Sequence, residues 1–497
     1  MLFESSFLSV YFVLLGVLSI YGLHRYYMAY LYYRNKGNVP SPKGEFKELP
    51  TVTIQLPMYN EQYVAERLIE AVVAIRYPKD KLEIQVLDDS TDETCVVAQR
   101  VVERFRSLGY DIRYIHRTNR QGYKAGALEE GLRQAKGDFI AVFDADFVPS
   151  PDFLERTIHF FTDANIGMVQ VRWEHLNRTF SWLTRAQAVL LDGHFMMESC
   201  ARHRSGRFFN FNGTAGIWRR VAIQEAGGWQ HDTLTEDLDL SYRAQLAGWN
   251  FIFLADTTSP AEIPVEMNSF KSQQHRWAKG SIQTAKKLLP EILRSDLPRK
   301  VKMEAFFHLT NNFAYLFMVL LCLLMPVSLV VRANYQSLWF LDLPVFLLAT
   351  VSIGFFYAAA QKEVGISGID RLKYLPLVLS VGIGMCINNA KAVLEALFGI
   401  ESGFTRTPKY NVVSRNNEWK AKRNYHRRVD WLPWLELTLG VWFSLAVVYA
   451  AITGGWLAVP FLMLFQFGFL YVSLLSLFQT RLAGRQPAPT GVSPSSN

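Results

Sequence analysis

Two pairs of carboxylates have the spacing and position of ligand-binding side chains. Asp88 and Asp89 follow one β-branched apolar run directly, and Asp144 and Asp146 follow another. An Asp-x-Asp at a strand end places two oxygen ligands around one divalent cation, and Mg²⁺ or Mn²⁺ in such a site completes its shell with phosphate and water. Most isolated pairs of this kind are surface turns or caps. The neighbouring residues must therefore decide what this pair does.

Those neighbours predict a nucleotide-sugar pocket. Tyr59 and Glu61 follow the first predicted strand, and Lys124 lies in a turn flanked by Gly122 and Gly126. A tyrosine at a strand end can stack on a base, a carboxylate can bind ribose or base groups, and a lysine in a glycine turn can contact a diphosphate. Lys124 taken singly is more simply a solvated loop lysine. Tyr59, Glu61 and Lys124 are predicted to bind the donor together with the four aspartates.

A candidate general base lies further along the chain. Thr235 has the type and position of a helix N-cap, followed directly by Glu236 and Asp237. A carboxylate there can deprotonate an attacking hydroxyl if a metal holds the leaving diphosphate opposite it. The simpler alternative for Asp237 is a first-turn carboxylate without a catalytic role.

A third polar cluster stands before the chain returns to the membrane. Gln273, Arg276 and Trp277 form this cluster. Arg276 can bind a diphosphate through two hydrogen bonds, and Trp277 can offer a flat face to a sugar ring.

The elements that must position these residues are strands alternating with helices. Short β-branched runs at 52–56, 84–87, 112–116 and 139–143 alternate with charged helical stretches between about residues 50 and 298. This alternation predicts an α/β domain with a largely parallel sheet. The carboxyl ends of parallel strands form the ligand crevice in such sheets, which is where the carboxylates lie.

The composition of the chain indicates membrane-spanning segments in addition to the globular domain. Of the 497 residues, 50% are hydrophobic and 19% are charged, which predicts both a globular domain and membrane spans. The net charge is +8. The four cysteines contain no close pair, so we expect reduced thiols and no structural metal site built from cysteine. A disulfide scaffold, a zinc-finger protein, a collagen and a disordered protein are excluded.

The apolar runs and the basic residues predict a topology. The run 7–31 is read as a retained transmembrane helix, and a cleaved signal is the alternative. The segment 401–430 carries a net charge of +5, which places it in the cytoplasm with the globular domain. Three apolar runs separate the two, and an even number of spans is needed, so the run 375–398 is predicted to be interfacial. The alternative is a true span with the basic segment outside.

The resulting organisation has six parts and about five spans. In chain order they are an N-terminal transmembrane helix (1–36), a cytoplasmic catalytic domain (50–300), two transmembrane helices (301–373), an interfacial helix with a cytoplasmic loop (374–430), two transmembrane helices (431–479) and a disordered tail (480–497).

The ordered motifs resemble those of inverting family 2 glycosyltransferases of the processive, cellulose-synthase-like type. The match covers residues 57–61, 88–89, 122–126, 144–146, 235–237 and 273–277. The stretch 209–216 most resembles plant cellulose-synthase-like A and C proteins, which make mannan and glucan backbones. The resemblance implies a GT-A fold, a Rossmann-like mixed and mostly parallel sheet, attached to an α-helical transmembrane bundle.

The resemblance also implies a role for each residue. Asp88 and Asp89 would bind the nucleoside, Asp144 and Asp146 the diphosphate and a Mg²⁺ or Mn²⁺ ion, and Asp237 would be the base. Gln273 and Arg276 would hold the diphosphate. The acceptor site would be formed by Asn212, Gly213, Thr214, Glu236 and Trp277. A single in-line displacement would convert an α-linked donor into a β-linkage.

A loop after the presumed interfacial helix resembles the Phe-x-Val-Thr-x-Lys gating loop of bacterial cellulose synthase. Phe404, Thr407 and Lys409 match that motif. Arg406 stands where the motif has valine, which leaves the gating role open.

The function predicted is transfer of hexose from UDP-glucose or GDP-mannose to a growing β-1,4-glucan or mannan, with translocation across the membrane. One alternative is a glycolipid synthase that glycosylates diacylglycerol or a sphingolipid once. Another is a transferase-like channel without catalysis. The expected partners are the nucleotide sugar, a polysaccharide or lipid acceptor and membrane lipids. Nucleic acid is not expected, because the positive charge gathers at the membrane border.

Overall fold

The computed structural model describes residues 2–332, 344–345, 347–401, 403, 406–413 and 431–483. Phe404 of the predicted gating loop and most of the basic segment 401–430 lie outside the described residues. Helix α19 (Val459–Ala483) continues through residues 480–483, which the prediction had assigned to the tail, and the rest of that predicted tail lies outside the described residues.

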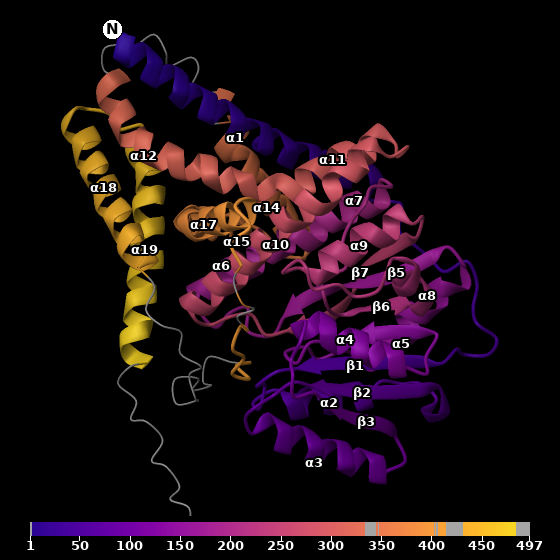
Figure 1. Cartoon of the computed structure of the whole chain (residues 1–497). Helices are drawn as coiled ribbons and strands as arrows, with labels where there is room; N and C mark the ends of the chain where they lie inside the picture. Colours follow the sequence, from indigo (N-terminus) through magenta and orange to yellow (C-terminus); the bar gives the residue numbers. More distant parts are fainter. Residues whose placement is uncertain are drawn as a thin grey trace, which may run out of the picture.

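A seven-stranded mixed sheet forms the centre of the globular part (Figure 1), in the order β3-β2-β1-β4-β6-β5-β7. The strands are β1 (Val52–Met58), β2 (Leu82–Asp88), β3 (Asp111–His116), β4 (Phe139–Val142), β5 (Ile166–His175), β6 (Gly216–Arg219) and β7 (Asn250–Ala261). The first four strands are parallel, and β6 runs antiparallel to both β4 and β5. The four predicted strands are β1 to β4, which confirms the α/β fold.

Helices cover both faces of the sheet, and therefore every residue of β1, β2 and β4 is buried. In β4, Ala141 packs with α2 (Ala65–Val73), α3 (Thr94–Ser107) and α5 (Phe153–Thr157). Its neighbours Ile140 and Val142 point to the other face. The second face is covered by α4 (Tyr123–Gln134), α6 (Trp182–Asp192), the π-helix Gly193–Ser199, α7 (Cys200–Arg204), α8 (Arg220–Glu225) and α9 (Glu236–Leu246).

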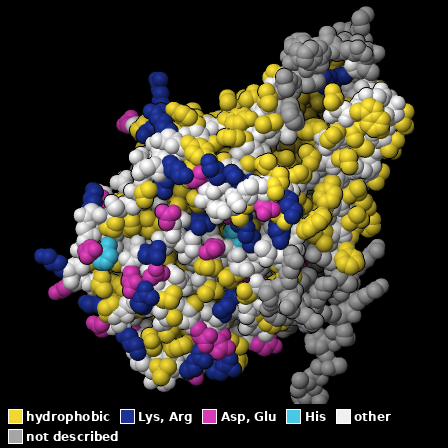
Figure 2. All heavy atoms as spheres, turned by 180° about the vertical axis from the view of Figure 1, so that it is seen from behind, with side chains coloured by type: hydrophobic (Ala, Val, Ile, Leu, Met, Phe, Trp, Pro, Cys, Tyr) yellow, Lys and Arg dark blue, Asp and Glu magenta, His cyan; other side chains and the backbone are white. Residues whose placement is uncertain are grey.

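Four described helices are long and apolar enough to span a membrane: Glu4–Asn35 within α1 (Leu2–Asn35), Arg299–Arg332, Leu432–Ile452 (α18) and Val459–Thr480 within α19. The second comprises α11 (Arg299–Thr310) and α12 (Ala314–Arg332). Seen from behind, hydrophobic side chains gather over this part of the molecule (Figure 2), while charged side chains dot the globular part. These helices give the chain the architecture of a multi-pass membrane protein.

Two further predicted membrane runs have other shapes. In the second half of the predicted transmembrane pair 301–373, the described residues include the π-helix Leu347–Val351 and α14 (Ser352–Glu363). The run 375–398 is broken into α16 (Leu375–Gly384), which follows the short helix α15 (Asp370–Lys373), and α17 (Cys386–Leu397). The two halves are bent by 41°, which suits a broken span or a re-entrant loop. The interfacial placement of this run stays a prediction.

The globular domain and the membrane helices share packed contacts. Met28 and Tyr32 of α1 and Phe356 of α14 belong to the same apolar cluster as the second face of the sheet. Lys271 of α10 (Met267–Arg294) forms a buried ion pair with Glu436 of α18, with 2.5 Å between Nζ and Oε2. The site described next is therefore fixed relative to the membrane helices.

Candidate active site

A pocket of about 170 Å³ opens beyond the carboxyl ends of β1 and β4. Most of the predicted site residues line it: Tyr59, Glu61, Asp89, Lys124, Asp144, Asp146, Asn212, Gly213, Glu236, Asp237, Gln273, Arg276, Trp277, Thr407 and Lys409. They come from loops and helices spread over some 350 positions of sequence, and the sheet edge brings them together.

Asp144 and Asp146 each bind a lysine. Lys124 Nζ lies 2.5 Å from Oδ1 of Asp144 and donates a second hydrogen bond to the carbonyl oxygen of Gly213. Lys409 Nζ lies 2.6 Å from Oδ2 of Asp146. The two aspartates supply the hard oxygen ligands that Mg²⁺ and Mn²⁺ prefer, and they line one pocket. They therefore fit a divalent cation, provided that the cation displaces or shares these lysine contacts.

Asp237 lies in the first turn of α9, where its Oδ1 accepts a hydrogen bond from the Leu238 amide at 2.8 Å. Burial and the neighbouring Glu236 carboxylate raise the pKa of Asp237 to about 7. Gly213 faces it with a backbone φ of +79°, and a Cβ atom there would lie 2.9 Å from Asp237 Oδ2. Only glycine keeps this approach to the carboxylate open. Asp237 thus has the pKa and the access of a general base.

Helix α10 fixes the position of this carboxylate. Thr235 takes the N-cap position of α9 as predicted, but its side chain makes no capping hydrogen bond. Instead it packs on α10, where a Cβ atom on Gly280 would lie 2.5 Å from Thr235 Oγ1. The same helix carries Gln273, Arg276 and Trp277 into the pocket. Burial lowers the pKa of Arg276, while Glu236 and Asp144 oppose that shift.

Arg120, Trp173 and Arg406 also line the pocket, although the sequence predicts no role for them there. The Arg120 guanidinium lies 3.3 Å from the centroid of the Tyr59 ring. Arg406, the departure from the gating motif, binds both oxygens of Glu61, at 3.0 and 3.2 Å. Burial raises the pKa of Glu61 to about 7, although Arg406 opposes this shift. In the sequence, the signal for this pair was Arg406 itself, because an arginine in place of the valine of the gating motif calls for an acidic partner.

Two residues predicted to bind the donor or the acceptor, Asp88 and Thr214, are not among the described residues that line the pocket. Asp88 is fully buried and accepts hydrogen bonds from the Tyr114 hydroxyl and the Ser90 amide, at 2.8 and 2.9 Å. Thr214 is also fully buried, and its Oγ1 accepts a hydrogen bond from the Asp144 amide. Asp89 does line the pocket, but Arg117 already binds both of its oxygens, at 2.8 and 2.6 Å.

Backbone strain concentrates around the pocket. Among the described residues, the non-glycine positions with positive φ are Asn60, Arg120, Tyr123, Ala215 and Asn411. Each of them lines the pocket or lies within two residues of a lining residue. Left-handed backbone at such residues costs free energy and persists where the surrounding structure demands it. The loops that carry the candidate ligands are thus held in uncommon conformations.

The charges of the lining nearly balance. Six carboxylates and five lysine or arginine side chains line the pocket, so the acids outnumber the bases by one. A bound diphosphate would add further negative charge at low effective dielectric, which is unfavourable unless a cation accompanies it. The pocket is therefore suited to a diphosphate that arrives with a divalent metal.

Comparisons with known proteins match the domain that carries this pocket. The family model "Glycosyltransferase like family 2" matches residues 50–280. Glucomannan 4-beta-mannosyltransferase 1 of Oryza sativa subsp. japonica is 44% identical over 269 residues, which are 53% of this chain and 51% of that protein. Glucomannan 4-beta-mannosyltransferase 2 of Arabidopsis thaliana is 42% identical over 300 residues, 58% of this chain and 56% of that protein. The chain spans about half the length of the curated relatives it matches.

A solved structure shares the fold. The mannosyltransferase PcManGT from Pyrobaculum calidifontis, in complex with GDP-Man and Mn²⁺, superposes with a TM-score of 0.50 and 20% sequence identity. The alignment covers 78% of this chain and 100% of that one. Residues 50–280 therefore match the family 2 glycosyltransferase model, and the globular domain has a GT-A-like fold.

Proposed function

We propose that this protein is a membrane-embedded, metal-dependent, inverting glycosyltransferase that extends a β-1,4-linked mannan or glucomannan from GDP-mannose. The observation that carries the proposal is the position of Asp237, a half-buried carboxylate whose pKa is raised to about 7, in the same pocket as Asp144, Asp146 and Arg276. The names of the relatives favour mannose over glucose as the sugar transferred.

The proposed reaction is a single displacement. A hydroxyl of the acceptor sugar attacks the anomeric carbon of the donor, and Asp237 takes the hydroxyl proton. The bond between that carbon and the diphosphate oxygen breaks, and the diphosphate leaves with the electron pair. Lys124 and Arg276 offset its growing charge. Attack opposite the leaving group inverts the anomeric carbon, so an α-linked donor gives a β-linkage.

Aromatic side chains in the same pocket suit an acceptor chain. Trp173 and Trp277 both line the pocket, together with Asn212 and Gly213 of the turn that faces Asp237. Flat indole faces bind the apolar faces of sugar rings. We assign these residues, with Glu236, to the acceptor side, and Thr214 supports this turn from behind the pocket through its hydrogen bond with the Asp144 amide.

Asp144 and Asp146 would hold the divalent cation, which supplies Lewis-acid stabilisation of the diphosphate when it is bound. Lys409 and Thr407 reach the pocket from the segment after α17, the predicted gating loop. We infer that Lys409 leaves Asp146 when the cation and the donor bind, so that this segment moves with the donor cycle.

We further propose that the globular domain faces the cytoplasm. The end of α10 and the start of α11 carry Lys286, Lys287, Arg299, Lys300 and Lys302, the excess of basic residues typical of the cytoplasmic side. A protease site inserted at the exposed turn around Gly109 is expected to be cut from the cytoplasmic side of sealed vesicles. Cleavage from the opposite side only would reverse this orientation.

The activity test uses the full chain in lipid nanodiscs with Mn²⁺ or Mg²⁺ and labelled GDP-mannose or UDP-glucose. Label is expected in an insoluble polymer that a β-1,4-mannanase degrades. Asp237→Asn is expected to abolish turnover and keep donor binding, whereas the control Glu130→Gln on the exposed face of α4 keeps both. Label confined to extractable lipid would replace the proposal with glycolipid synthesis. Donor binding without turnover by the unmodified chain would indicate a transferase-like channel.

A further inference from the structure

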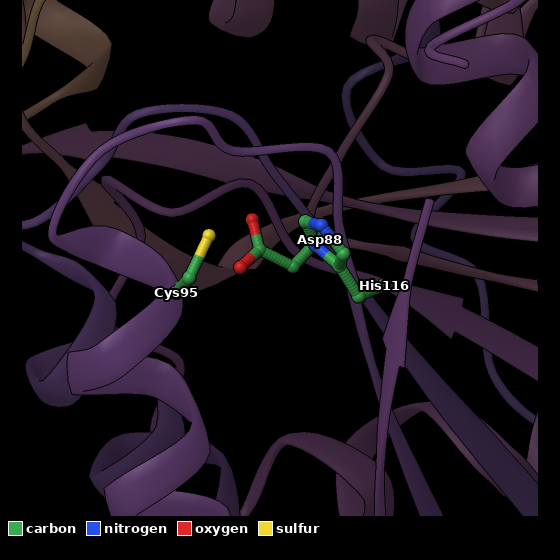
Figure 3. Close-up of side chains that lie close together, drawn as sticks. All are labelled: Asp88, Cys95 and His116. Atoms are coloured by element: carbon green, nitrogen blue, oxygen red, sulfur yellow. The ribbon is translucent and has the colours of Figure 1, made fainter. Parts of the chain in front are cut away.

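A second group of side chains of the types that ligate metals lies outside the described lining of the active-site pocket. Asp88, Cys95 and His116 each point a ligand atom into one small region (Figure 3), and these atoms all lie within 4.8 Å of one another. Asp88 ends β2 and His116 ends β3, and the two are direct partners in the parallel register of these strands. Their side chains therefore leave the same face of the sheet. Cys95 approaches from the first turn of α3.

The donor set differs in kind from the Asp144 and Asp146 pair. An imidazole nitrogen, a thiol sulfur and a carboxylate oxygen are ligands of Zn²⁺ and of Co²⁺, whereas Mg²⁺ and Mn²⁺ favour oxygen ligands. Three protein ligands leave a fourth position for water. A cation at this site takes the place of the thiol proton, which is released to solvent, and of the weak hydrogen bond that Cys95 Sγ donates to the Ser90 carbonyl.

The surroundings orient the carboxylate and leave an entry path. The Tyr114 hydroxyl and the Ser90 amide donate to the two oxygens of Asp88 at 2.8 and 2.9 Å, as outer-shell groups do at metal sites. The Tyr114 ring is stacked on the His116 ring at a centroid distance of 6.1 Å, with an angle of 9° between the planes. Asp88 is buried, while His116 is exposed to solvent.

We propose that Asp88, Cys95 and His116 form a transition-metal site that binds Zn²⁺, separate from the Asp144 and Asp146 site. An ion there holds the end of β2, the end of β3 and the start of α3 together. Because Asp88 directly precedes Asp89, which lines the active-site pocket, an ion on Asp88 also weakens donor binding. This second consequence rests on the proposed function, while metal binding itself does not.

The test reads the metal site without any sugar. All four cysteines of the chain lie in described residues, and three of them are buried, so a thiol reagent reports mainly on Cys95. In the full chain in nanodiscs, Zn²⁺ is expected to slow the labelling of Cys95 at least tenfold. Co²⁺ is expected to produce a thiolate-to-metal charge-transfer band in the near ultraviolet.

Variants separate this site from adventitious binding. Without metal, Cys95 in His116→Ala is expected to be labelled at the same rate as in the unmodified chain. With metal, this variant is expected to lose both the Zn²⁺ protection and the cobalt band. Cys95→Ser is expected to lose the cobalt band. The control His231→Ala removes another exposed histidine and keeps both signals. Labelling that is indifferent to Zn²⁺, or protection that survives in His116→Ala, would overturn the site. If Zn²⁺ protects Cys95 but does not change the affinity for GDP-mannose, the metal site is supported and its proposed effect on donor binding is refuted.

Discussion

Lys409 Nζ lies 2.6 Å from Oδ2 of Asp146, although 263 positions separate the two residues in the sequence. The same ammonium group donates to the carbonyl oxygen of Glu262 at 2.8 Å. The next residue, Tyr410, donates its amide to the Glu262 carboxylate at 3.0 Å. The segment after α17 is thus anchored beside one of the two carboxylates that would bind the metal.

Removal of the Lys409 ammonium group is expected to raise the affinity of the site at Asp146 for a divalent cation. In Lys409→Met, Asp146 loses its lysine partner, so a cation no longer competes with an ammonium group for this carboxylate. Affinity for Mn²⁺ in the absence of donor should rise about tenfold, or about 1.4 kcal/mol. Calorimetric titration of the purified chain measures it, and Lys136→Met, which removes a surface partner of Asp111, serves as the control. An unchanged Mn²⁺ affinity would refute the competition.

The pair of Arg406 and Glu61 is expected to behave as a coupled unit. Both side chains are nearly buried, so the loss of one partner leaves the other charge poorly compensated. Arg406→Val and Glu61→Gln should each lower the thermal stability, and the double variant should lose less than the sum, with a coupling of about 1–3 kcal/mol. Thermal unfolding of the four forms gives this value. The exposed pair of Arg76 and Glu155 is the control and should show no measurable coupling. Additive losses at the first pair would contradict the expectation.

The activity is expected to have an acid limb set by Asp237. Burial and Glu236 raise the pKa of this carboxyl to about 7, and a general base works only when it is deprotonated. The rate should therefore rise as the pH passes upward through about 7 and fall about tenfold per pH unit well below it. Initial rates with saturating Mn²⁺ test this. In Glu236→Gln the neighbouring charge is gone, so the midpoint should move to lower pH; a midpoint that does not move would remove Glu236 as a cause.

The contact between α9 and α10 is expected to tolerate no added methyl group. In Gly280→Ala the new Cβ atom would lie 2.5 Å from Thr235 Oγ1 and 2.8 Å from its backbone nitrogen, so the start of α9 must shift. Overpacking of this kind costs about 1–3 kcal/mol, and the shift would displace Asp237. Turnover should fall more than donor binding does.

Gly354→Ala is the matched control for that contact, because it also lies in a helix and a Cβ atom there meets nothing within 4 Å. It should leave both turnover and thermal stability close to those of the unmodified chain. Equal effects of the two substitutions would show that the Gly280 contact has no special role.

The sequence by itself determined the α/β fold and most of the pocket. Strands β1 to β4 follow from β-branched runs, and side chains placed after parallel strands must meet at one sheet edge. For that reason the positions of Asp144 and Asp146 relative to Tyr59 could be predicted. Asp237 was placed by its position at a helix start, a local signal that needs no long-range information.

Only the tertiary structure decided which charges pair and which side chains cluster. The contacts of Arg406 with Glu61 and of Lys409 with Asp146 join residues far apart in the chain, and nothing local records them. The grouping of Cys95 with His116 depends on the register of β2 and β3 and on the packing of α3. A spacing rule for cysteine pairs cannot find such a site. The pKa of Asp237 likewise arises from burial, a property of the folded chain that no motif contains.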